Sequence, residues 1–248
     1  MRRVKFFSVL LCAVLILTCC CGCSISSSNE ETGYQSDLKD GEYTVYSKYY
    51  DPFGYGLMYT MKVRDGIVTS VNLKETNSSG TDRLTDNTAV NKWEGCNQNL
   101  SQVLANFYDS VIHRQSAQVD AVTGATVTSD SFNTLSKAAF SMAKSGTSSQ
   151  VLDDFTWTYS VTNSVDSASG SQETLKVTYD GSDMTNVECG EVVNSTALYA
   201  TGKIYSGFAG QTMTSKTLDP ITSADNPAEA ERYNGMLAQI NQLRQPYK

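Results

Sequence analysis

The stretch Leu57-Met-Tyr-Thr-Met-Lys-Val-Arg-Asp-Gly-Ile-Val-Thr-Ser-Val-Asn-Leu73 decides the fold of the first half of the chain. The dipeptide Asp65-Gly66 at its centre favours a two-residue type I′ turn, in which both residues have positive φ. Apolar or β-branched residues recur at every second position on both sides of this turn: Leu57, Tyr59, Met61 and Val63 before it, and Ile67, Thr69, Val71 and Leu73 after it. This period of two predicts a β-hairpin with one buried face.

The elements around the hairpin complete a small domain. The alternating stretch Gly41–Ser47 predicts a strand before it, and apolar residues at helical spacing predict a helix from about Asn97 to Arg114. A second helix is expected after Ser129, a good N-cap followed by Asp130 in the first turn, and Gly146 should end it. The first half is therefore predicted to be α+β, a small antiparallel sheet packed with two helices.

The second half of the chain repeats part of this plan. Leu175–Gly181 resembles Met61–Gly66 with one extra residue, and Thr185–Cys189 resembles Thr69–Leu73. Asn226-Pro-Ala-Glu229 combines an N-cap, a proline at the first helical position and a carboxylate three residues on, which predicts a helix start. The sequence offers no counterpart of the last loop and helix of the first half, so we interpret the second half as a degenerate, truncated copy of similar α+β character. An unrelated small β-rich domain is the alternative.

The first residues of the chain indicate export. A short basic region is followed by the apolar run Phe6–Leu17, which has the length of a signal-peptide core and is too short to span a bilayer comfortably. A cysteine just after such a core is what a diacylglyceryl transferase modifies through its thiol. Cys20 and Cys23 are both candidates, because neither matches the usual cleavage site at every position. We expect a lipoprotein anchored in the cell membrane on its extracytoplasmic face; a plain secretory signal is the alternative.

Composition divides the rest of the chain. Residues 24–39 are rich in Ser, Asn, Glu and Gly, which suits a flexible tether after a signal peptide of residues 1–23. The polar stretch Ser145–Gln150 follows a predicted helix and precedes a β-like segment. We therefore predict two domains, residues 40–146 and residues 151–248.

Charge and rare residues limit the possible functions. The chain carries a formal charge of −7, and loss of the three basic residues of the signal leaves 16 basic against 26 acidic residues, so the mature part carries −10. Such a protein repels a polyanion, and nucleic acid is not expected as a partner. The single histidine, His113, supports neither a His-rich metal site nor a Ser/His/Asp hydrolase, and we expect it on the surface at a helix end. Outside the signal region only Cys96 and Cys189 remain, and two cysteines leave open whether they pair.

One motif points to a specific chemistry. Asp120-Ala-Val-Thr-Gly-Ala-Thr126, followed by Val127-Thr-Ser129, lies between the two predicted helices of the first half. Together with Asp40-Gly-Glu-Tyr43 and the Lys62–Gly66 hairpin, this motif resembles the FMN-binding domain family. That family occurs in subunits of sodium-translocating and Rnf-type electron-transfer complexes and in extracellular electron-transfer lipoproteins. The resemblance covers about residues 40–144.

The resemblance implies a covalent flavin. In that family a separate flavin transferase, using FAD and a magnesium ion, joins the last threonine of the motif to the phosphate of FMN. This threonine is Thr126 here, and Asp120, Thr123, Gly124 and Ala125 form the recognised sequence. A threonine hydroxyl is a poor nucleophile without a base and a metal, so the transferase needs access to an exposed segment. The phosphate should then lie near a helix start, where free amides favour negative charge.

Function follows as an expectation. We expect a membrane-anchored flavoprotein that carries electrons from a membrane donor to an extracellular acceptor or partner flavoprotein. In such a protein the cofactor supplies the chemistry, and the chain supplies location and redox tuning. The sequence indicates no catalytic residue and no metal ligand. Two alternatives stay open: a flavin-dependent reductase, and a surface lipoprotein that acts as a binding module with an unused flavin site.

Overall fold

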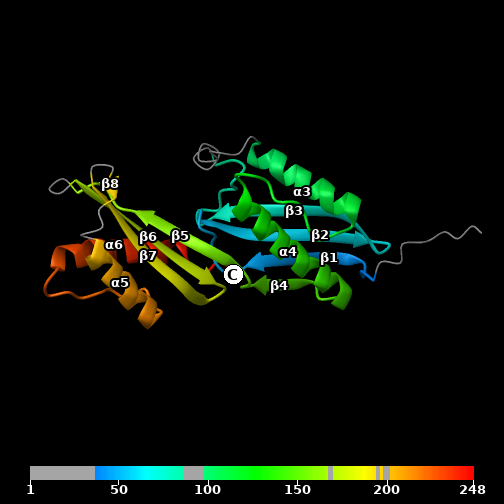
Figure 1. Ribbon diagram of the computed structural model, residues 1–248. Helices are drawn as coiled ribbons and strands as arrows, with labels where there is room; N and C mark the ends of the chain where they lie inside the picture. Colours follow the sequence, from blue (N-terminus) through cyan, green and yellow to red (C-terminus); the bar gives the residue numbers. More distant parts are fainter. Residues whose placement is uncertain (1–36, 87–97, 167–169, 194–195, 198–201) are drawn as a thin grey trace, which may run out of the picture. The chain divides into compact units, whose positions relative to one another are not determined.

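The computed structural model describes residues 37–86, 98–166, 170–193, 196–197 and 202–248. Within these residues the chain is α+β, with two four-stranded sheets that each pack with two helices (Figure 1). In chain order, with the labels of Figure 1, the elements are β1 (Gly41–Ser47), β2 (Tyr55–Arg64), β3 (Ile67–Asn77), α3 (Leu100–Arg114), α4 (Thr126–Ser145), β4 (Ser149–Leu152), β5 (Thr156–Thr162), β6 (Ser171–Asp180), β7 (Asp183–Val193), β8 (Thr196–Ala197), α5 (Gly202–Ser215) and α6 (Pro227–Leu243). The predicted fold class is confirmed.

The first sheet has the strand order β3-β2-β1-β4. Antiparallel pairing joins β1 to β2 and β2 to β3, whereas β4 pairs with β1 in parallel. Parallel neighbours need a crossover connection, and β4 follows directly after α4. The sheet is thus mixed rather than purely antiparallel. The predicted boundary at residues 146–151 includes the first three residues of β4, which belongs to the first sheet.

The hairpin between β2 and β3 closes on Asp65 and Gly66. Their φ values are 53° and 71°, so both residues have the positive φ that a type I′ turn requires. The backbone N–H of Gly66 donates to Asp40 Oδ1 at 3.0 Å. This bond ties the turn to the residue just before β1.

A β-bulge interrupts the hairpin close to its turn. The register shifts between Lys62 and Val63, and Thr69 Oγ1 donates to the carbonyl oxygen of Lys62 at 3.3 Å. Because the bulge adds a residue to β3, Val68 faces the core, whereas Ile67 and Thr69 are exposed. The predicted alternation therefore holds from Val71 onwards but is wrong at the first residues after the turn.

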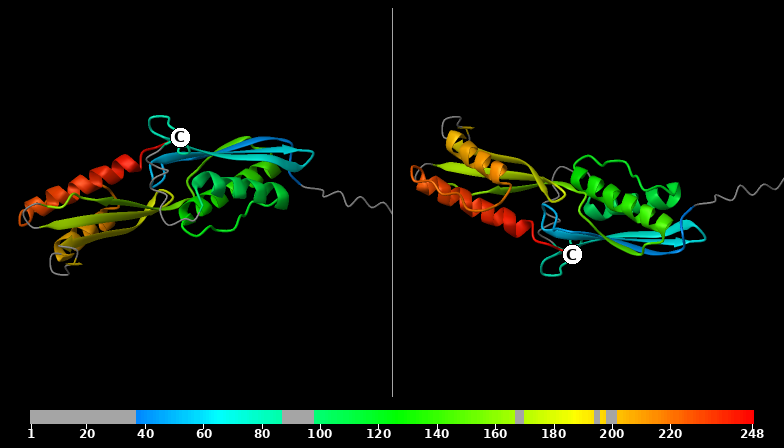
Figure 2. Two further views of the ribbon diagram at one scale, coloured as in Figure 1. Left: turned by 90° about the horizontal axis from the view of Figure 1, so that it is seen from above. Right: turned by 90° about the horizontal axis from the view of Figure 1, so that it is seen from below.

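Two helices cover one face of the first sheet (Figure 2). Tyr59 from β2, Phe107 from α3 and Phe132 from α4 are fully buried or nearly so. The ring centroid of Phe132 lies 5.3 Å from that of Tyr59 and 5.0 Å from that of Phe107. This aromatic cluster holds both helices on the sheet.

The ends of α3 follow from its side chains. Asn99 and Gln102 form a reciprocal capping box, so the helix begins at Leu100 rather than near residue 97. His113 is exposed in the last turn, as expected. Gln115, with a φ of 50°, ends the helix, and its side chain accepts from the N–H and donates to the carbonyl of one β3 residue, Val68, at 2.7 and 3.0 Å.

The start of α4 differs from the prediction. The helix begins at Thr126, and Ala125 is its N-cap. Ser129, predicted as the N-cap, instead lies buried in the first turn. The end is as predicted: Gly146 has a φ of 88°, and its N–H donates to the carbonyl of Met142 at 2.7 Å.

The second sheet has the order β5-β6-β7-β8, and all its pairs are antiparallel. Its hairpin between β6 and β7 carries a bulge between Thr178 and Tyr179. Thr185 Oγ1 donates to the carbonyl oxygen of Thr178 at 3.3 Å, just as Thr69 does to Lys62. The two hairpins thus share both the position of the bulge and the hydrogen bond that closes it.

The helices of the second half take the places of α3 and α4. α5 packs on β7, and α6 packs on β5 and β6, so the expectation that the second half lacks the last helix of the first is wrong. Asn133 of α4 pairs through its side chain with the N–H and carbonyl of Val119 (2.8 and 3.1 Å). Asn234 of α6 makes the same pair of bonds to Ile221 (2.7 and 2.9 Å).

The two halves contact each other directly. All described residues fall in one compact unit, Ser36–Lys248, and one continuous apolar core includes residues of both halves. The Tyr159 hydroxyl donates to the carbonyl of Tyr50 at 2.6 Å. After α6 the chain returns to the first sheet, where the N–H of Tyr247 donates to the carbonyl of Lys48 at 2.8 Å. The division into two domains stays a prediction.

The predicted signal peptide and most of the tether lie outside the described residues, and so do Cys20, Cys23 and Cys96. Among the helices of the described part, none combines the length and the apolar character that crossing a bilayer requires. Cys189 is a free, half-buried thiol, and burial raises its pKa to about 12.

Candidate functional site

Thr126 is the first residue of α4, and its side chain is exposed. The amides at the start of an α-helix have no partner within the helix. Among the residues that the structure describes, no side chain caps this helix start, and the first turn of α4 has no acidic residue. The hydroxyl of Thr126 is therefore accessible beside uncapped amides and the positive end of the helix dipole.

The motif before Thr126 folds into a tight turn. The N–H of Ala125 donates to the carbonyl of Val122 at 2.9 Å, with Thr123 and Gly124 at the corner. Gly124 has a φ of 82°, which other residues adopt at a cost. Thr123 and Gly124 are exposed, whereas Ala125 is buried. The predicted residues are thus brought together, with the small Ala125 packed beneath the exposed corner.

Two α4 side chains hold this loop. The buried hydroxyl of Ser129 donates to the carbonyl of Ala125 at 2.9 Å and accepts from the N–H of Val122 at 3.2 Å. One turn further on, Asn133 holds Val119, just before the motif begins. The sequence pattern gave Ser129 a different role and did not single out Asn133, because neither contact is visible from local spacing.

Asp120, the first residue of the motif, points away from this framework. Its carboxylate is exposed and lies 3.2 Å from the guanidinium of Arg114, at the end of α3. An exposed pair of this kind contributes at most about 1 kcal/mol to stability. Asp120 is therefore free to exchange Arg114 for another cation.

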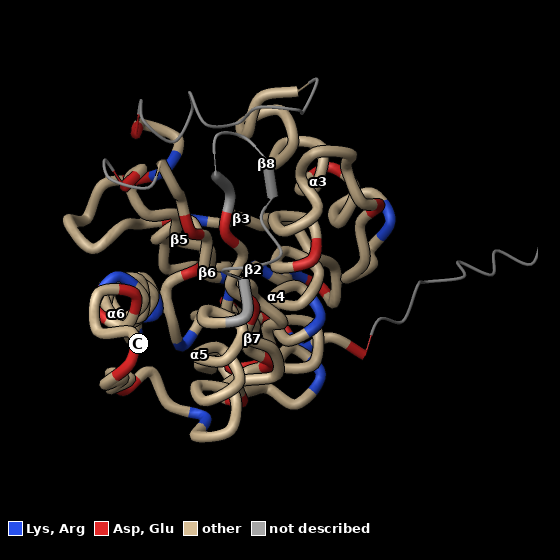
Figure 3. The backbone as a smooth tube through the Cα atoms, turned by 60° about the vertical axis from the view of Figure 1, so that its left-hand side comes forward, with Lys and Arg blue, Asp and Glu red and all other residues tan. Residues whose placement is uncertain are grey.

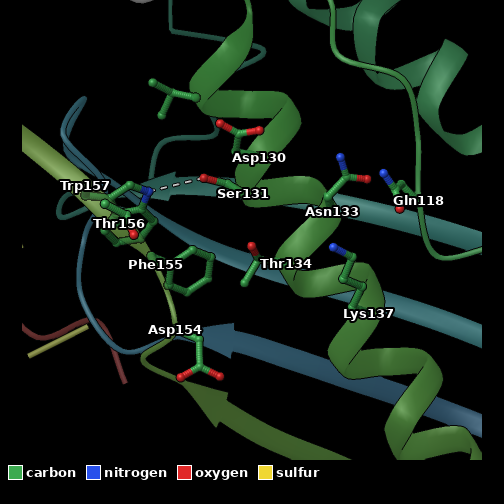
Figure 4. Close-up of a pocket in the computed structure, with 11 residues that line it drawn as sticks. Gln118, Asp130, Ser131, Asn133, Thr134, Lys137, Asp154, Phe155, Thr156 and Trp157 are labelled. Atoms are coloured by element: carbon green, nitrogen blue, oxygen red, sulfur yellow. Dashed lines mark hydrogen bonds between the residues drawn. The ribbon is translucent and has the colours of Figure 1, made fainter. Parts of the chain in front are cut away.

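A cavity of about 420 Å³ lies along α4 beyond the motif. Figure 4 shows Asp130, Asn133 and Lys137 on the helix side and the segment Asp154–Trp157 opposite them. Thr126 precedes these helix residues by four, seven and eleven positions, so it lies on the same stripe of α4. The cavity therefore opens on the side of the helix that carries the exposed hydroxyl.

Two aromatic residues form part of the wall opposite α4. The rings of Phe155 and Trp157 stack with centroids 4.4 Å apart and planes 15° from parallel. The indole N–H of Trp157 donates to Ser131 Oγ at 3.2 Å (Figure 4). Both rings are buried, and the Trp157–Ser131 bond joins the second half to α4.

A buried charge cluster lies at the end of the first sheet that is remote from the Asp65-Gly66 turn. Arg83 Nη1 lies 2.8 Å from Glu75 Oε2 and 3.9 Å from Asp51 Oδ2, and all three side chains are buried. Burial, followed by the nearby negative charge of Glu75, raises the pKa of Asp51 to about 7. Two acids thus share this arginine, and a proton on Asp51 relieves their repulsion near neutral pH.

The fold and the threonine site together define a flavin-binding module. Residues 54–141 match the family described as the FMN-binding domain, and this segment includes the hairpin, α3, the threonine motif and most of α4. The predicted resemblance to this family is confirmed over residues 54–141. No curated protein matches the chain.

Two solved structures are similar to part of the chain. A crystal structure of a Clostridium perfringens protein is 28% identical, with a TM-score of 0.44, and the match covers 46% of this chain and 97% of that one. A solution structure of a Clostridium thermocellum protein is 22% identical, with a TM-score of 0.32, over 43% of this chain and 93% of that one.

Proposed function

We propose that this chain is a membrane-anchored, extracytoplasmic flavoprotein that carries FMN covalently on Thr126 and acts as an electron carrier. The observation that carries the proposal is the position of Thr126. Its exposed hydroxyl stands at the first residue of a helix whose start has neither a capping side chain nor an acidic residue. Within an FMN-binding domain, this is where a phosphate diester is best accommodated.

The attachment reaction is supplied by a flavin transferase with FAD and a magnesium ion. The oxygen of Thr126 forms a new bond to the phosphorus of the FMN half, the pyrophosphate bond of FAD breaks, AMP leaves, and the threonine proton is lost. The chain itself presents the nucleophile: the Thr123-Gly124 corner is exposed, and Gly124 allows close approach of the backbone. Asp120 is exposed enough to meet the transferase or its metal.

The chain would hold the phosphate with the first-turn amides of α4. A phosphate carries negative charge and several acceptor oxygens, which suits amides that lack a partner. When bound, FMN supplies the electron-transfer chemistry. A covalent link also prevents loss of the cofactor outside the cell, where a reversible ligand dissociates whenever its concentration falls below its dissociation constant.

The location that the sequence predicts would suit a carrier role. The lipoprotein-type signal, with Cys20 or Cys23 as the lipidated residue, would place the domain on the outer face of the cell membrane beyond a tether of residues 24–39. The partners would be the flavin transferase, a membrane electron donor and an extracellular acceptor or partner flavoprotein. Acidic and basic residues are interspersed along the described backbone of both halves (Figure 3), and the mature charge of −10 disfavours nucleic acid.

The decisive experiment is an intact-mass measurement. The mature chain is co-expressed with a flavin transferase, and the mass of one FMN, less one water, should be added. Thr126→Ala should abolish the addition completely. Thr134→Ala is the matched control, because Thr134 lies on the same helix two turns further on, and it should be modified like the unaltered chain.

Two results would overturn the proposal. An unmodified chain, made beside a transferase that modifies another substrate, would favour a binding module with an unused flavin site. Turnover of a soluble acceptor by the modified domain alone, without a partner, would favour a reductase.

A separate mass measurement identifies the anchor. The lipid adds mass to the unaltered chain, and this addition should be lost in whichever of Cys20→Ala and Cys23→Ala removes the lipidated cysteine.

A further inference from the structure

We propose that Ser129 is a positioning residue for the attachment of FMN to Thr126. Its hydroxyl holds the Val122–Ala125 turn, so that the flavin transferase meets Thr126 in a preformed geometry. This inference rests on the proposed function, because it concerns the same modification.

The geometry places Ser129 at the centre of the motif. A serine hydroxyl has one donor and two acceptor positions, and here it donates to the carbonyl of Ala125 and accepts from the N–H of Val122. The carbonyl of Val122 already accepts from the N–H of Ala125. Both backbone groups of Val122 are therefore fixed, which leaves the two-residue corner little freedom before Thr126.

The helix itself does not need this hydroxyl. The backbone N–H of Ser129 already donates to the carbonyl of Ala125 at 2.9 Å, which is the ordinary bond of the first turn. A second bond from the side chain to the same carbonyl tends to weaken or bend a helix slightly. The hydroxyl is better explained by its bond to Val122, outside the helix.

The second half provides an internal comparison. α4 and α6 align through Asn133 and Asn234, which clamp Val119 and Ile221 in the same way. Seven residues before each asparagine the helix begins, with Thr126 in α4 and Pro227 in α6.

Four residues before each asparagine stands Ser129 in α4 and Ala230 in α6, and both are buried. The clamp is present in both halves, whereas the serine is found only beside the threonine. We therefore assign the asparagines to the fold and Ser129 to the modification.

The test is the initial rate of FMN incorporation into the purified mature chain, with excess FAD, magnesium and a fixed amount of transferase. Ser129→Ala should lower kcat/KM for the protein substrate about tenfold, the effect of a lost hydrogen-bonding partner for a held backbone group. The KM for FAD should not change. The thiol of Ser129→Cys forms only weak hydrogen bonds, so its kcat/KM should lie between that of Ser129→Ala and that of the unaltered chain.

Ser136→Ala is the matched control. Ser136 is also a fully buried serine of α4 with one side-chain bond, to the hydroxyl of Tyr59 at 3.1 Å, but it is remote from the motif. It should be modified at the unaltered rate. Amide hydrogen exchange should be faster at Val122 in Ser129→Ala and unchanged there in Ser136→Ala.

The outcomes separate this inference from the proposed function. If Ser129→Ala takes up FMN as fast as the unaltered chain, or faster, the turn need not be preformed and the inference is wrong. If Ser136→Ala slows modification equally, the effect is one of helix stability and the inference is again wrong. If the unaltered chain takes up no FMN, the proposed function fails instead.

Discussion

The two halves of the molecule share a framework and differ at one loop. Each has a hairpin with a bulge closed by a threonine, Thr69 or Thr185. Each has a helix whose asparagine, Asn133 or Asn234, clamps the preceding loop. At the helix start, however, only the first half offers a hydroxyl, because Pro227 stands where the first half has Thr126.

The ends of α3 and α5 extend the comparison. Gln115 and Lys216 both have positive φ, 50° and 58°, just after their helices. The Gln115 side chain bonds both backbone groups of Val68, and Lys216 Nζ donates to the carbonyl of Met184 at 2.6 Å. Val68 and Met184 are each the second residue after their hairpin turn. Different side chains thus connect the end of a helix to the second residue after the hairpin turn in each half. This indicates that the position of the side chain matters more than its type.

What the halves share therefore marks what the fold requires, and what they do not share marks candidates for function. A proline at the first helical position is favourable for the helix, because its missing N–H has no partner there anyway. It cannot accept a phosphate ester. The second half has the more ordinary helix start, and the first half has the one that carries the proposed attachment hydroxyl.

The largest expected effect tests whether a core substitution in either half lowers the stability of the chain by the same amount. Phe132 and Tyr233 occupy equivalent positions on α4 and α6, and both are fully buried. Phe132→Ala and Tyr233→Ala should each lower the free energy of unfolding by about 3–5 kcal/mol, measured by urea denaturation. Val165→Ala, at an exposed site, should change it by less than about 0.5 kcal/mol.

The shape of that transition sharpens the comparison. Because the core runs through both halves, we expect one transition that both substitutions shift. Two transitions, each shifted by one substitution, would contradict a single cooperative unit and would support the predicted boundary between two domains.

The next effect concerns buried acidic side chains, whose pKa values are shifted in opposite directions in the two halves. Asp51 shares Arg83 with Glu75, and burial raises its pKa to about 7. In the second half burial acts on Glu173 too, but hydrogen bonds, first from Arg232, hold its pKa below the usual value. Any loss of stability between pH 5 and pH 7 should therefore come from the first half.

The sign follows from proton binding. Between the unfolded pKa of about 3.9 and the folded value, Asp51 is protonated only in the folded chain, so stability falls as pH rises. The expected loss is at most about 1.4 kcal/mol per pH unit between pH 5 and 7. Asp51→Asn should flatten this slope because an amide does not titrate in this range. The turn should be preserved, since the amide oxygen can still accept from the N–H groups of Phe53 and Tyr55. Glu173→Gln should lower stability at each of these pH values without changing the slope; an unchanged slope in Asp51→Asn would contradict the assignment.

A smaller effect should be equal in the two halves. Asn133→Ala and Asn234→Ala each remove two bonds to a loop residue, and each should cost about 2 kcal/mol of unfolding free energy. Asn186→Ala is the control, since the Asn186 side chain is exposed and donates to Glu188, two residues further along the same strand. A cost confined to Asn133 would break the equivalence and would place the clamp with the function of the first half.

The sequence predicted elements whose signals are local. The Asp65-Gly66 turn and the alternation of β2 were visible, and so was the start of α6, because proline at position 227 marks a first helical residue. The Asn226 side chain nevertheless makes no capping bond. β4 was missed because it is an edge strand with exposed residues at three of its four positions. α5 was missed because Gly207 and Gly210 lie inside it, and glycine is a poor helix former.

The sequence named the residues of the candidate site but not their geometry. The motif named Thr126 as the expected attachment residue, and Ser129 resembled an N-cap because serine is common there. The real start has Ala125 as N-cap, which gives no signal in the sequence. The cavity beside α4 depends on Asp154–Trp157, which reach it only through tertiary contacts. Such contacts are not encoded in spacing along the chain.

The smallest expected effect tests the bulge that the two hairpins share. Thr69→Val and Thr185→Val each remove one exposed hydrogen bond of 3.3 Å while keeping a β-branched side chain. Each should cost about 0.5 kcal/mol, because water replaces part of an exposed bond, and should lower the Tm by about 1–2 °C. The exposed neighbours Ser70→Ala and Asn186→Ala are the controls. Equal small losses would mean that both bulges are closed in the same way, whereas a loss in one hairpin alone would show that the hydrogen bond stabilises only one of the two bulges.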